Sequence, residues 1–203
     1  MKTKLIAISG IDGSGKSSII SSLARKLENQ GYKVLITDAM QPCNYFRNLK
    51  EASKRLNMKV WDVFGATLPN ICYVADLHES INKNILPNID IYDYIIIHRY
   101  DLCCRAYSML NDCDMNLIDS LLMGIPKPDF HFYLDVDIEV ALKRIEIRSK
   151  IKSEKENFIT LSNAIQNYKK LFNKYNDIFI IDNNDTLDAC INVIEEILQE
   201  EKY

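Results

Sequence analysis

Five short apolar runs recur along the chain, separated by longer stretches in which apolar residues return with helical spacing. The runs are KLIAIS, KVLIT, YIIIH, FHFYLDV and IFIID, at residues 4–9, 33–37, 94–98, 130–136 and 178–182. Because their hydrophobicity is nearly continuous, they indicate strands that are covered on both faces. Such strands, alternating with helices, predict an α/β fold built on a five-stranded parallel sheet.

The stretch between the first two runs has the pattern of an amphipathic helix. Apolar residues at positions 19, 20, 23, 24 and 27 share one helix face, and Gly31 supplies a C-terminal stop. Further helices are expected over about residues 44–85, 101–123 and 186–200, and another begins after Asp137, a natural N-cap. With no internal repeat and no low-complexity linker, residues 1–203 are predicted to form a single domain.

Composition and charge argue against several classes of partner. The 203 residues are 47% hydrophobic, which suits one sizeable core, and the net charge is −3, from 25 basic and 28 acidic residues. This balance gives no reason to expect nucleic acid or an anionic membrane as a partner, although a local basic anion pocket remains possible. No run reaches transmembrane length or forms a signal peptide. Six cysteines without CxxC spacing are typical of reduced thiols in a cytoplasmic protein.

The strongest chemical signal is GIDGSGKSS, which follows the first strand and leads into the first helix. It satisfies the GxxxxGK[ST] pattern in the context that supports a P-loop. Backbone N–H groups of such a loop surround phosphate oxygens, the lysine places its charge at the β- and γ-phosphates, and the first serine hydroxyl binds Mg²⁺. We therefore expect ATP or GTP with Mg²⁺, with Ser17 as metal ligand, on the nucleotide-binding residues Gly10, Ile11, Asp12, Gly13, Ser14, Gly15, Lys16, Ser17 and Ser18.

A P-loop alone does not specify a reaction, since kinases, GTPases and motor ATPases share it. The segment NNDT at residues 183–186 lacks the lysine of a guanine-binding NKxD motif, which disfavours a GTPase. The small size argues against a motor. A small-molecule phosphotransferase, with an acceptor pocket beside the P-loop, fits best.

Several segments together resemble the thymidylate kinases, which pass the γ-phosphoryl group of ATP to deoxythymidine monophosphate (dTMP). Besides the P-loop, these are HRYDLCCRAYSM, where the family has a DRY motif, then PDFHFYLDVDIEVALKRI and NYKKLF. The resemblance covers nearly the whole chain. It implies the nucleoside monophosphate kinase fold with strand order 2-3-1-4-5, a nucleotide acceptor and a homodimer in the cytoplasm.

The resemblance also assigns roles to individual residues. Asp12 would face the acceptor sugar and Mg²⁺, or else act as a turn residue, and Arg99 would bridge the donor and acceptor phosphates. Tyr73 would stack on the acceptor's base, and Tyr107 would lie near its sugar. Tyr100 matches a further family tyrosine. For all three tyrosines, core packing is the alternative.

Three positions depart from the family pattern, and all concern the acceptor side. His98 replaces the aspartate of the DRY motif, Asp38 and Ala39 stand where the family has a phosphate-gripping arginine, and Leu77 replaces a base-reading arginine. A carboxylate at position 38 would repel a monophosphate. Either Arg105 or Arg47 could replace the missing clamp, although Arg105 could equally be a surface arginine.

Residues 148–157 are nearly all polar and suggest a lid, or alternatively a solvated helix surface. Since Ser14 is not basic, the charge that stabilises the transferring phosphoryl group is expected from the lid region, where Arg148 is the preferred catalytic candidate beside Lys16, Asp12 and Arg99. Arg144 lies four residues earlier on the same helix face and is expected to contact the nucleotide.

Three functional hypotheses follow. The first is a thymidylate-kinase-like nucleoside monophosphate kinase with Tyr73, His98, Arg99, Tyr100, Arg105 and Tyr107 as acceptor-binding residues. The second is a kinase of a neutral hydroxyl, such as that of a deoxynucleoside, with Asp12 or His98 as general base. The third is an ATP-binding regulator that transfers nothing.

Overall fold

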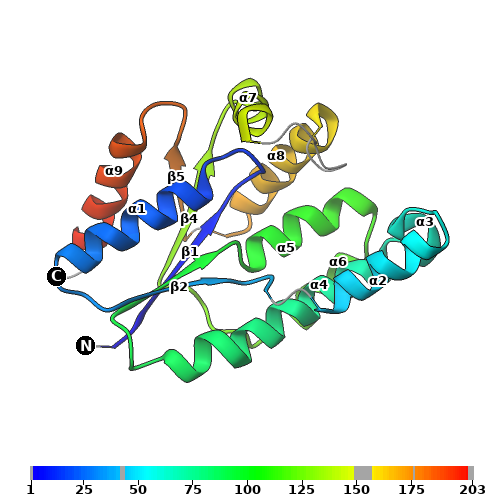
Figure 1. Ribbon diagram of the computed structural model, residues 1–203, viewed down its shortest axis with the longest axis horizontal. Coiled ribbons are helices and arrows are strands. Elements are labelled where there is room, and N and C mark those ends of the chain that lie inside the picture. Colours follow the sequence, from blue (N-terminus) through cyan, green and yellow to red (C-terminus); the bar gives the residue numbers. More distant parts are fainter. Residues whose placement is uncertain (1, 42–43, 149–156, 176, 201–203) are drawn as a thin grey trace.

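The computed structural model describes residues 2–41, 44–148, 157–175 and 177–200. Within these residues, five parallel strands form one sheet in the order β2-β3-β1-β4-β5 (Figure 1). They are β1 (Lys4–Ser9), β2 (Val34–Asp38), β3 (Tyr94–His98), β4 (Phe130–Asp135) and β5 (Ile178–Asp182). The predicted α/β class, parallel sheet and strand order 2-3-1-4-5 are confirmed.

The main helices of the described residues flank the sheet. They are α1 (Lys16–Asn29), α2 (Asn44–Arg55), α3 (Val60–Phe64), α4 (Thr67–Ser80), α5 (Asp101–Ser108), α6 (Met115–Leu121), α7 (Ile138–Arg148), α8 (Phe158–Phe172) and α9 (Leu187–Glu200). Helix α7 begins directly after Asp137, as expected. The lid predicted at residues 148–157 falls mainly on residues 149–156, which lie outside the described residues, between the end of α7 and Asn157, the N-cap of α8.

Two long helices expected from the pattern are divided in the structure. The region 44–85 contains α2, α3 and α4, and then a π-helical turn over Ile81–Ile85. Breaks fall at Asn57 (φ 53°) and Gly65 (φ 67°), because a left-handed residue cannot continue a right-handed helix. The region 101–123 divides likewise at Asp112 (φ 50°), after which the Asp114 carboxylate accepts hydrogen bonds from the first turn of α6.

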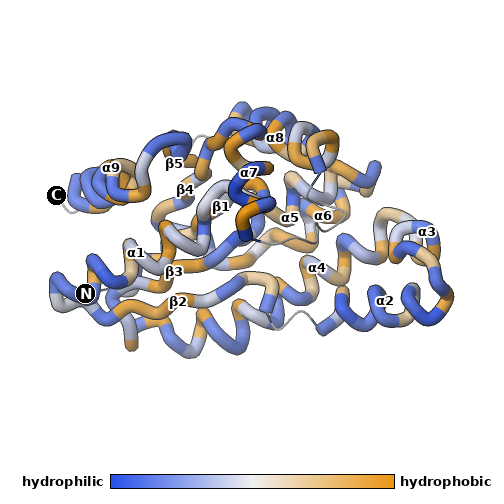
Figure 2. The backbone as a smooth tube through the Cα atoms, turned by 45° about the horizontal axis from the view of Figure 1, so that its top comes forward, coloured by the Kyte–Doolittle hydropathy of each residue, from blue (hydrophilic) through white to orange (hydrophobic). Residues whose placement is uncertain are grey.

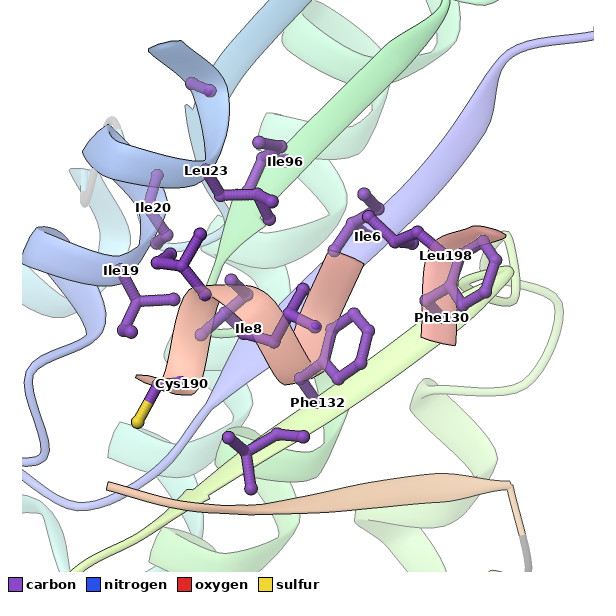
Figure 3. Close-up of a cluster of buried hydrophobic side chains, with 14 of the residues drawn as sticks. Ile6, Ile8, Ile19, Ile20, Leu23, Ile96, Phe130, Phe132, Cys190 and Leu198 are labelled. Carbon is purple, nitrogen blue, oxygen red and sulfur yellow. The ribbon is translucent and has the colours of Figure 1, made fainter. Parts of the chain in front are cut away.

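Helices α1 and α9 cover one face of the sheet and enclose a buried cluster (Figure 3). Side chains of β1, β3 and β4, among them Ile6, Ile96 and Phe132, meet Leu23 of α1 and Leu198 of α9 there. On the opposite face, helices α4 to α8 and strands β1, β3 and β4 contribute buried residues to two further clusters. The central strands are therefore covered on both sides, as their continuous hydrophobicity predicted.

The edge strands β2 and β5 do not fit that prediction fully. Ile36 of β2 is 48% exposed and Ile180 of β5 is 53% exposed, because each lies on a strand with a neighbour on one side only. Figure 2 shows that β2 and β3 are largely hydrophobic, whereas α2, at the far end of the molecule, is mostly hydrophilic. The carboxyl ends of β1, β3 and β5 meet at one edge of the sheet, which is where ligands bind in open α/β sheets.

Candidate active site

The P-loop joins β1 to α1 and folds tightly against its surroundings. Gly13 and Gly15 have φ values of 84° and 85°, which glycine adopts at low cost. A Cβ atom on Gly13 would lie 2.4 Å from the carbonyl oxygen of Ala141 in α7, so only glycine fits there. From the end of β5, the Asn183 side chain donates a hydrogen bond to the Ser14 carbonyl oxygen (2.5 Å). The loop is thus held by α7 and β5 as well as by its own helix.

Lys16, the first residue of α1, is 5% exposed and folds back over the loop. Its Nζ donates to the carbonyl oxygens of Gly10 (3.1 Å) and Ile11 (2.7 Å). Burial, aided by the nearby charge of Arg99, lowers the pKa of Lys16 to about 8. The carbonyl oxygens are neutral hydrogen-bond acceptors. A bound phosphate would give the Lys16 ammonium group a negatively charged partner.

A cavity of about 500 Å³ opens beside the P-loop, and we call it the donor cavity. Arg144 and Arg148 of α7 line it, and the Arg144 Nη1 atom is buried with no hydrogen-bond partner among the described residues. An unpaired guanidinium nitrogen beside a P-loop suits a phosphate oxygen. The other lining residues that the sequence had singled out are Asp12, Gly13, Gly15, Lys16, Ser17, Ser18, His98 and Arg99.

The remaining P-loop residues, Gly10, Ile11 and Ser14, are buried and do not line the donor cavity. Gly10 and Ile11 hold Lys16 through their carbonyl oxygens instead. Ser17 and Asp12 both line the donor cavity, and side-chain oxygen atoms such as theirs suit Mg²⁺. Magnesium keeps several waters and binds substrate phosphates, so it needs no larger cluster of protein ligands. The residues present therefore fit the expected metal.

Asp12 and Arg99 mark the boundary between the donor cavity and a second cavity. Arg99 follows β3 with a φ of 70°, and its Nη2 lies 2.5 Å from Asp12 Oδ1. Both residues also line a smaller cavity of about 190 Å³, the inner cavity. Its other lining residues are Met40, Asn70, Tyr73, Cys103, Cys104 and Tyr107. A ligand in each cavity would meet the same carboxylate and guanidinium groups.

The inner cavity adjoins a wider outer cavity of about 840 Å³, with which it shares Asn70, Tyr73 and Tyr107. Phe46 of α2 stacks on the Tyr73 ring at 4.0 Å between centroids, and Tyr107 lies with its ring 5.9 Å from the Arg99 guanidinium carbon. Tyr73 and Tyr107 thus line both cavities, and their contacts with the base and sugar of an acceptor stay predictions. A flat ring on this wall suits an aromatic ligand.

His98 and Asp38 form a pair at the carboxyl ends of two neighbouring strands. The two residues are aligned across β3 and β2, and His98 Nδ1 lies 2.8 Å from Asp38 Oδ2. Burial alone would raise the pKa of Asp38, but hydrogen bonds with His98 and the Met40 N–H lower it. His98 lines the donor cavity, whereas Asp38 lines neither the donor nor the inner cavity. From the sequence we expected Asp38 to repel an acceptor phosphate. In the structure this carboxylate is turned toward His98 instead, which corrects that expectation.

The structure also corrects the expectations for Arg105 and Tyr100. The Arg105 guanidinium pairs with Asp101 (2.5 Å) and Asp119 (2.9 Å), away from all three cavities. The Tyr100 ring is fully buried, and its hydroxyl donates to the Pro126 carbonyl oxygen (2.8 Å). Arg105 of α5 thus points toward α6, and Tyr100, which precedes α5, points toward the loop before β4, so both are packing residues.

The other two positions discussed for the acceptor side also lie apart from the cavities. Leu77 is fully buried in the core beneath α4. Arg47 is exposed on α2 and bonds to Asn44, so it does not serve as a clamp in this conformation.

Five residues of the site were not singled out from the sequence: Asn70, Asn183, Cys103, Cys104 and Met40. Asn70 lies one helical turn before Tyr73, and that spacing could have indicated it. Asn183 follows a strand at its carboxyl end, a position that often carries ligand contacts. Cys103, Cys104 and Met40 carry no comparable signal.

Fold and site together define a P-loop phosphotransferase, in which two neighbouring cavities share the Asp12–Arg99 pair. The family model described as "Thymidylate kinase" matches residues 8–194. The chain belongs to the thymidylate kinase family, and it is an enzyme of the nucleoside monophosphate kinase type.

Several relatives match almost the entire chain. It is 30% identical to the "Probable thymidylate kinase" of Thermococcus kodakarensis, over 97% of this chain and 99% of that protein. It is 31% identical to "Probable thymidylate kinase 1" of Saccharolobus solfataricus, over 96% and 98% of the two chains. The "Thymidylate kinase" of Brachyspira hyodysenteriae is 30% identical, over 97% and 95%. In the described part of the chain, no helix is long and apolar enough to cross a membrane.

Proposed function

We propose that this protein transfers the γ-phosphoryl group of ATP to the phosphate of dTMP or a related nucleoside monophosphate. The observation that carries the proposal is the Asp12–Arg99 pair, which lines both the donor and the inner cavity. An arginine at this boundary can contact the transferring group and the acceptor phosphate together. Family membership favours dTMP as the acceptor.

The other residues of the donor cavity have complementary roles. Lys16 contacts the β- and γ-phosphates, and Arg144 and Arg148 add positive charge around the equatorial oxygens of the transferring group. When bound, Mg²⁺ neutralises the phosphate charge, and Ser17 would hold it. The oxygens of a monophosphate are already anionic nucleophiles, so no strong general base is required.

The His98–Asp38 pair favours a second candidate function, phosphorylation of a neutral hydroxyl. An imidazole whose Nδ1 is fixed by a carboxylate retains Nε2 as a proton acceptor, which a hydroxyl acceptor needs. A deoxynucleoside is the corresponding substrate. We further propose that the enzyme works in the cytoplasm, and the homodimer implied by the resemblance stays a prediction.

The test is ADP release by the purified protein with Mg-ATP, across deoxynucleoside and ribonucleoside monophosphates and free nucleosides. The proposal expects stimulation by at least one monophosphate. Lys16→Ala should reduce the rate at least a hundredfold, because it removes a charge that acts in the transition state. Stimulation by nucleosides alone would favour the second candidate. No stimulation by any acceptor in the panel would count against both.

A further inference from the structure

The outer cavity carries charge of one sign. Among the described residues that line it, the charged side chains are those of Lys50, Lys54 and Lys59, and none is a carboxylate. Lys50 and Lys54 lie one helical turn apart on α2, and Lys59 is the N-cap residue of α3. All three are exposed, in a chain whose net charge is −3. This is the kind of local basic pocket that the overall charge balance leaves possible.

Two carboxylates lie on the same helices as these lysines, Glu51 on α2 and Asp62 on α3, and neither lines the outer cavity. Helix α2 sets its single carboxylate against four basic residues, Arg47, Lys50, Lys54 and Arg55. Within the described part of the chain, Lys50 and Lys54 form no ion pair. At the end of the molecule that α2 and α3 form, a ligand therefore meets a positively charged wall (Figure 1).

The inner cavity adjoins both of the other cavities. It shares Asp12 and Arg99 with the donor cavity, and Asn70, Tyr73 and Tyr107 with the outer cavity. A nucleoside triphosphate in the donor cavity would close the first of these connections. An acceptor that enters while the nucleotide is bound therefore passes the lysines of the outer cavity.

A row of aromatic rings follows the same approach. Trp61 of α3 packs on Phe46 at 6.1 Å between ring centroids, and Phe46 stacks on Tyr73 at 4.0 Å. Trp61 and Phe46 line the outer cavity, whereas Tyr73 lines both the outer and the inner cavity. Aromatic faces suit the flat base of a nucleotide, and ammonium groups suit its phosphate. The outer cavity thus offers both kinds of group that a nucleoside monophosphate needs.

We propose that Lys50, Lys54 and Lys59 draw the acceptor into the active site, and that they select an acceptor with a phosphate over an uncharged one. A cavity lined by one sign of charge raises the local concentration of opposite charge and speeds association. A monophosphate gains from this field, whereas a free nucleoside does not. This inference rests on the proposed function, since it takes the acceptor to be a nucleoside monophosphate whose phosphate reaches Arg99.

The test uses Trp61, the only tryptophan of the chain, as a fluorescent probe in the outer cavity. Stopped-flow mixing of dTMP with the protein, saturated with Mg-ADP, gives the association and dissociation rate constants. The entrance variant combines Lys50→Gln, Lys54→Gln and Lys59→Gln, and glutamine has a helix propensity close to that of lysine. A control variant with the same change of charge replaces three exposed lysines that line none of the three cavities, Lys33, Lys169 and Lys170, by glutamine.

At low ionic strength, the association rate constant should fall about tenfold in the entrance variant and stay close to the wild-type value in the control variant. The dissociation rate constant should change by less than about twofold, since charges at the rim of a site act mainly on association. In 1 M NaCl, where charges are screened beyond about 3 Å, all three proteins should bind dTMP at similar rates.

ADP release from Mg-ATP gives a second readout, in which kcat/KM for dTMP should fall in the entrance variant at low ionic strength while kcat is kept. Equal association rate constants and equal kcat/KM in wild type and entrance variant would overturn this inference and leave the proposed function intact. A loss confined to dissociation, or equal in the control variant, would also overturn it. Inactivity of the wild type with every nucleoside monophosphate, by contrast, would remove the proposed function on which it rests.

Discussion

His131 is a buried histidine that the reaction does not use. It lies in β4, with Nε2 2.8 Å from Ser9 Oγ and Nδ1 3.9 Å from Asp101 Oδ1. Burial lowers the pKa of His131, and this outweighs the opposite influence of Asp101 and Asp177. Below the ordinary histidine pKa of about 6.5, the unfolded chain therefore binds a proton that the folded chain does not.

From this difference we predict that the free energy of unfolding falls as the pH drops below about 6.5. The slope contributed by one such group is at most about 1.4 kcal/mol per pH unit. His131→Gln removes the titrating group and should flatten the dependence between pH 7 and pH 5. Urea unfolding at several pH values measures the free energy of unfolding of both proteins. Parallel curves for wild type and variant would show that other groups cause the acid sensitivity.

A close contact between two elements can require glycine more strictly than a positive φ angle does. Gly13 and Gly31 have similar φ values, 84° and 90°, but a Cβ on Gly13 would meet the backbone of α7, whereas Gly31 has nothing within 4 Å. We predict that Gly31→Ala costs about 1 kcal/mol of conformational strain. Gly13→Ala should cost about 1–3 kcal/mol more, because α7 must move. Urea unfolding of both variants tests this, and equal losses would contradict the close contact.

The same contrast between local and long-range causes explains which elements could be predicted from the sequence. The strands were found because five apolar runs are bounded by polar residues, and the first helix because one face is apolar and a glycine follows it. The breaks at Asn57 and Asp112 escaped prediction, since neither residue type forces a left-handed conformation. The surrounding tertiary structure, which no short segment encodes, decides those positions.

At the scale of the molecule, Asn183 joins two segments far apart in the sequence, since it lies 169 residues from the Ser14 carbonyl that it contacts. We predict that Asn183→Ala weakens ADP binding about tenfold, because the P-loop loses one hydrogen bond that shapes it. Asn184→Ala is the control, as that side chain bonds Asp182 and the Asp137 N–H instead. Isothermal titration calorimetry measures the ADP affinity of both variants. A similar loss of affinity in Asn184→Ala would indicate a general effect on the loop after β5.

The donor and acceptor halves of the site differ in how far the sequence predicted them. The donor half is largely one contiguous motif, so its residues could be named in advance. The acceptor half is assembled from several elements, and the direction of each side chain depends on packing. Arg99 and Arg105 illustrate this: both follow β3, but the former meets Asp12, whereas the latter is drawn to Asp101 and Asp119.

The hydrogen bond between Asn183 and Ser14 has a further consequence, for protein synthesis. A ribosome makes Ser14 of the P-loop 169 residues before Asn183, so a nascent chain contains the phosphate-binding motif long before it contains the side chain that braces it. Translation must have passed Asn183 before the nucleotide site takes its final form. The growing chain therefore gains little stabilisation from cellular ATP before Asn183 has been made.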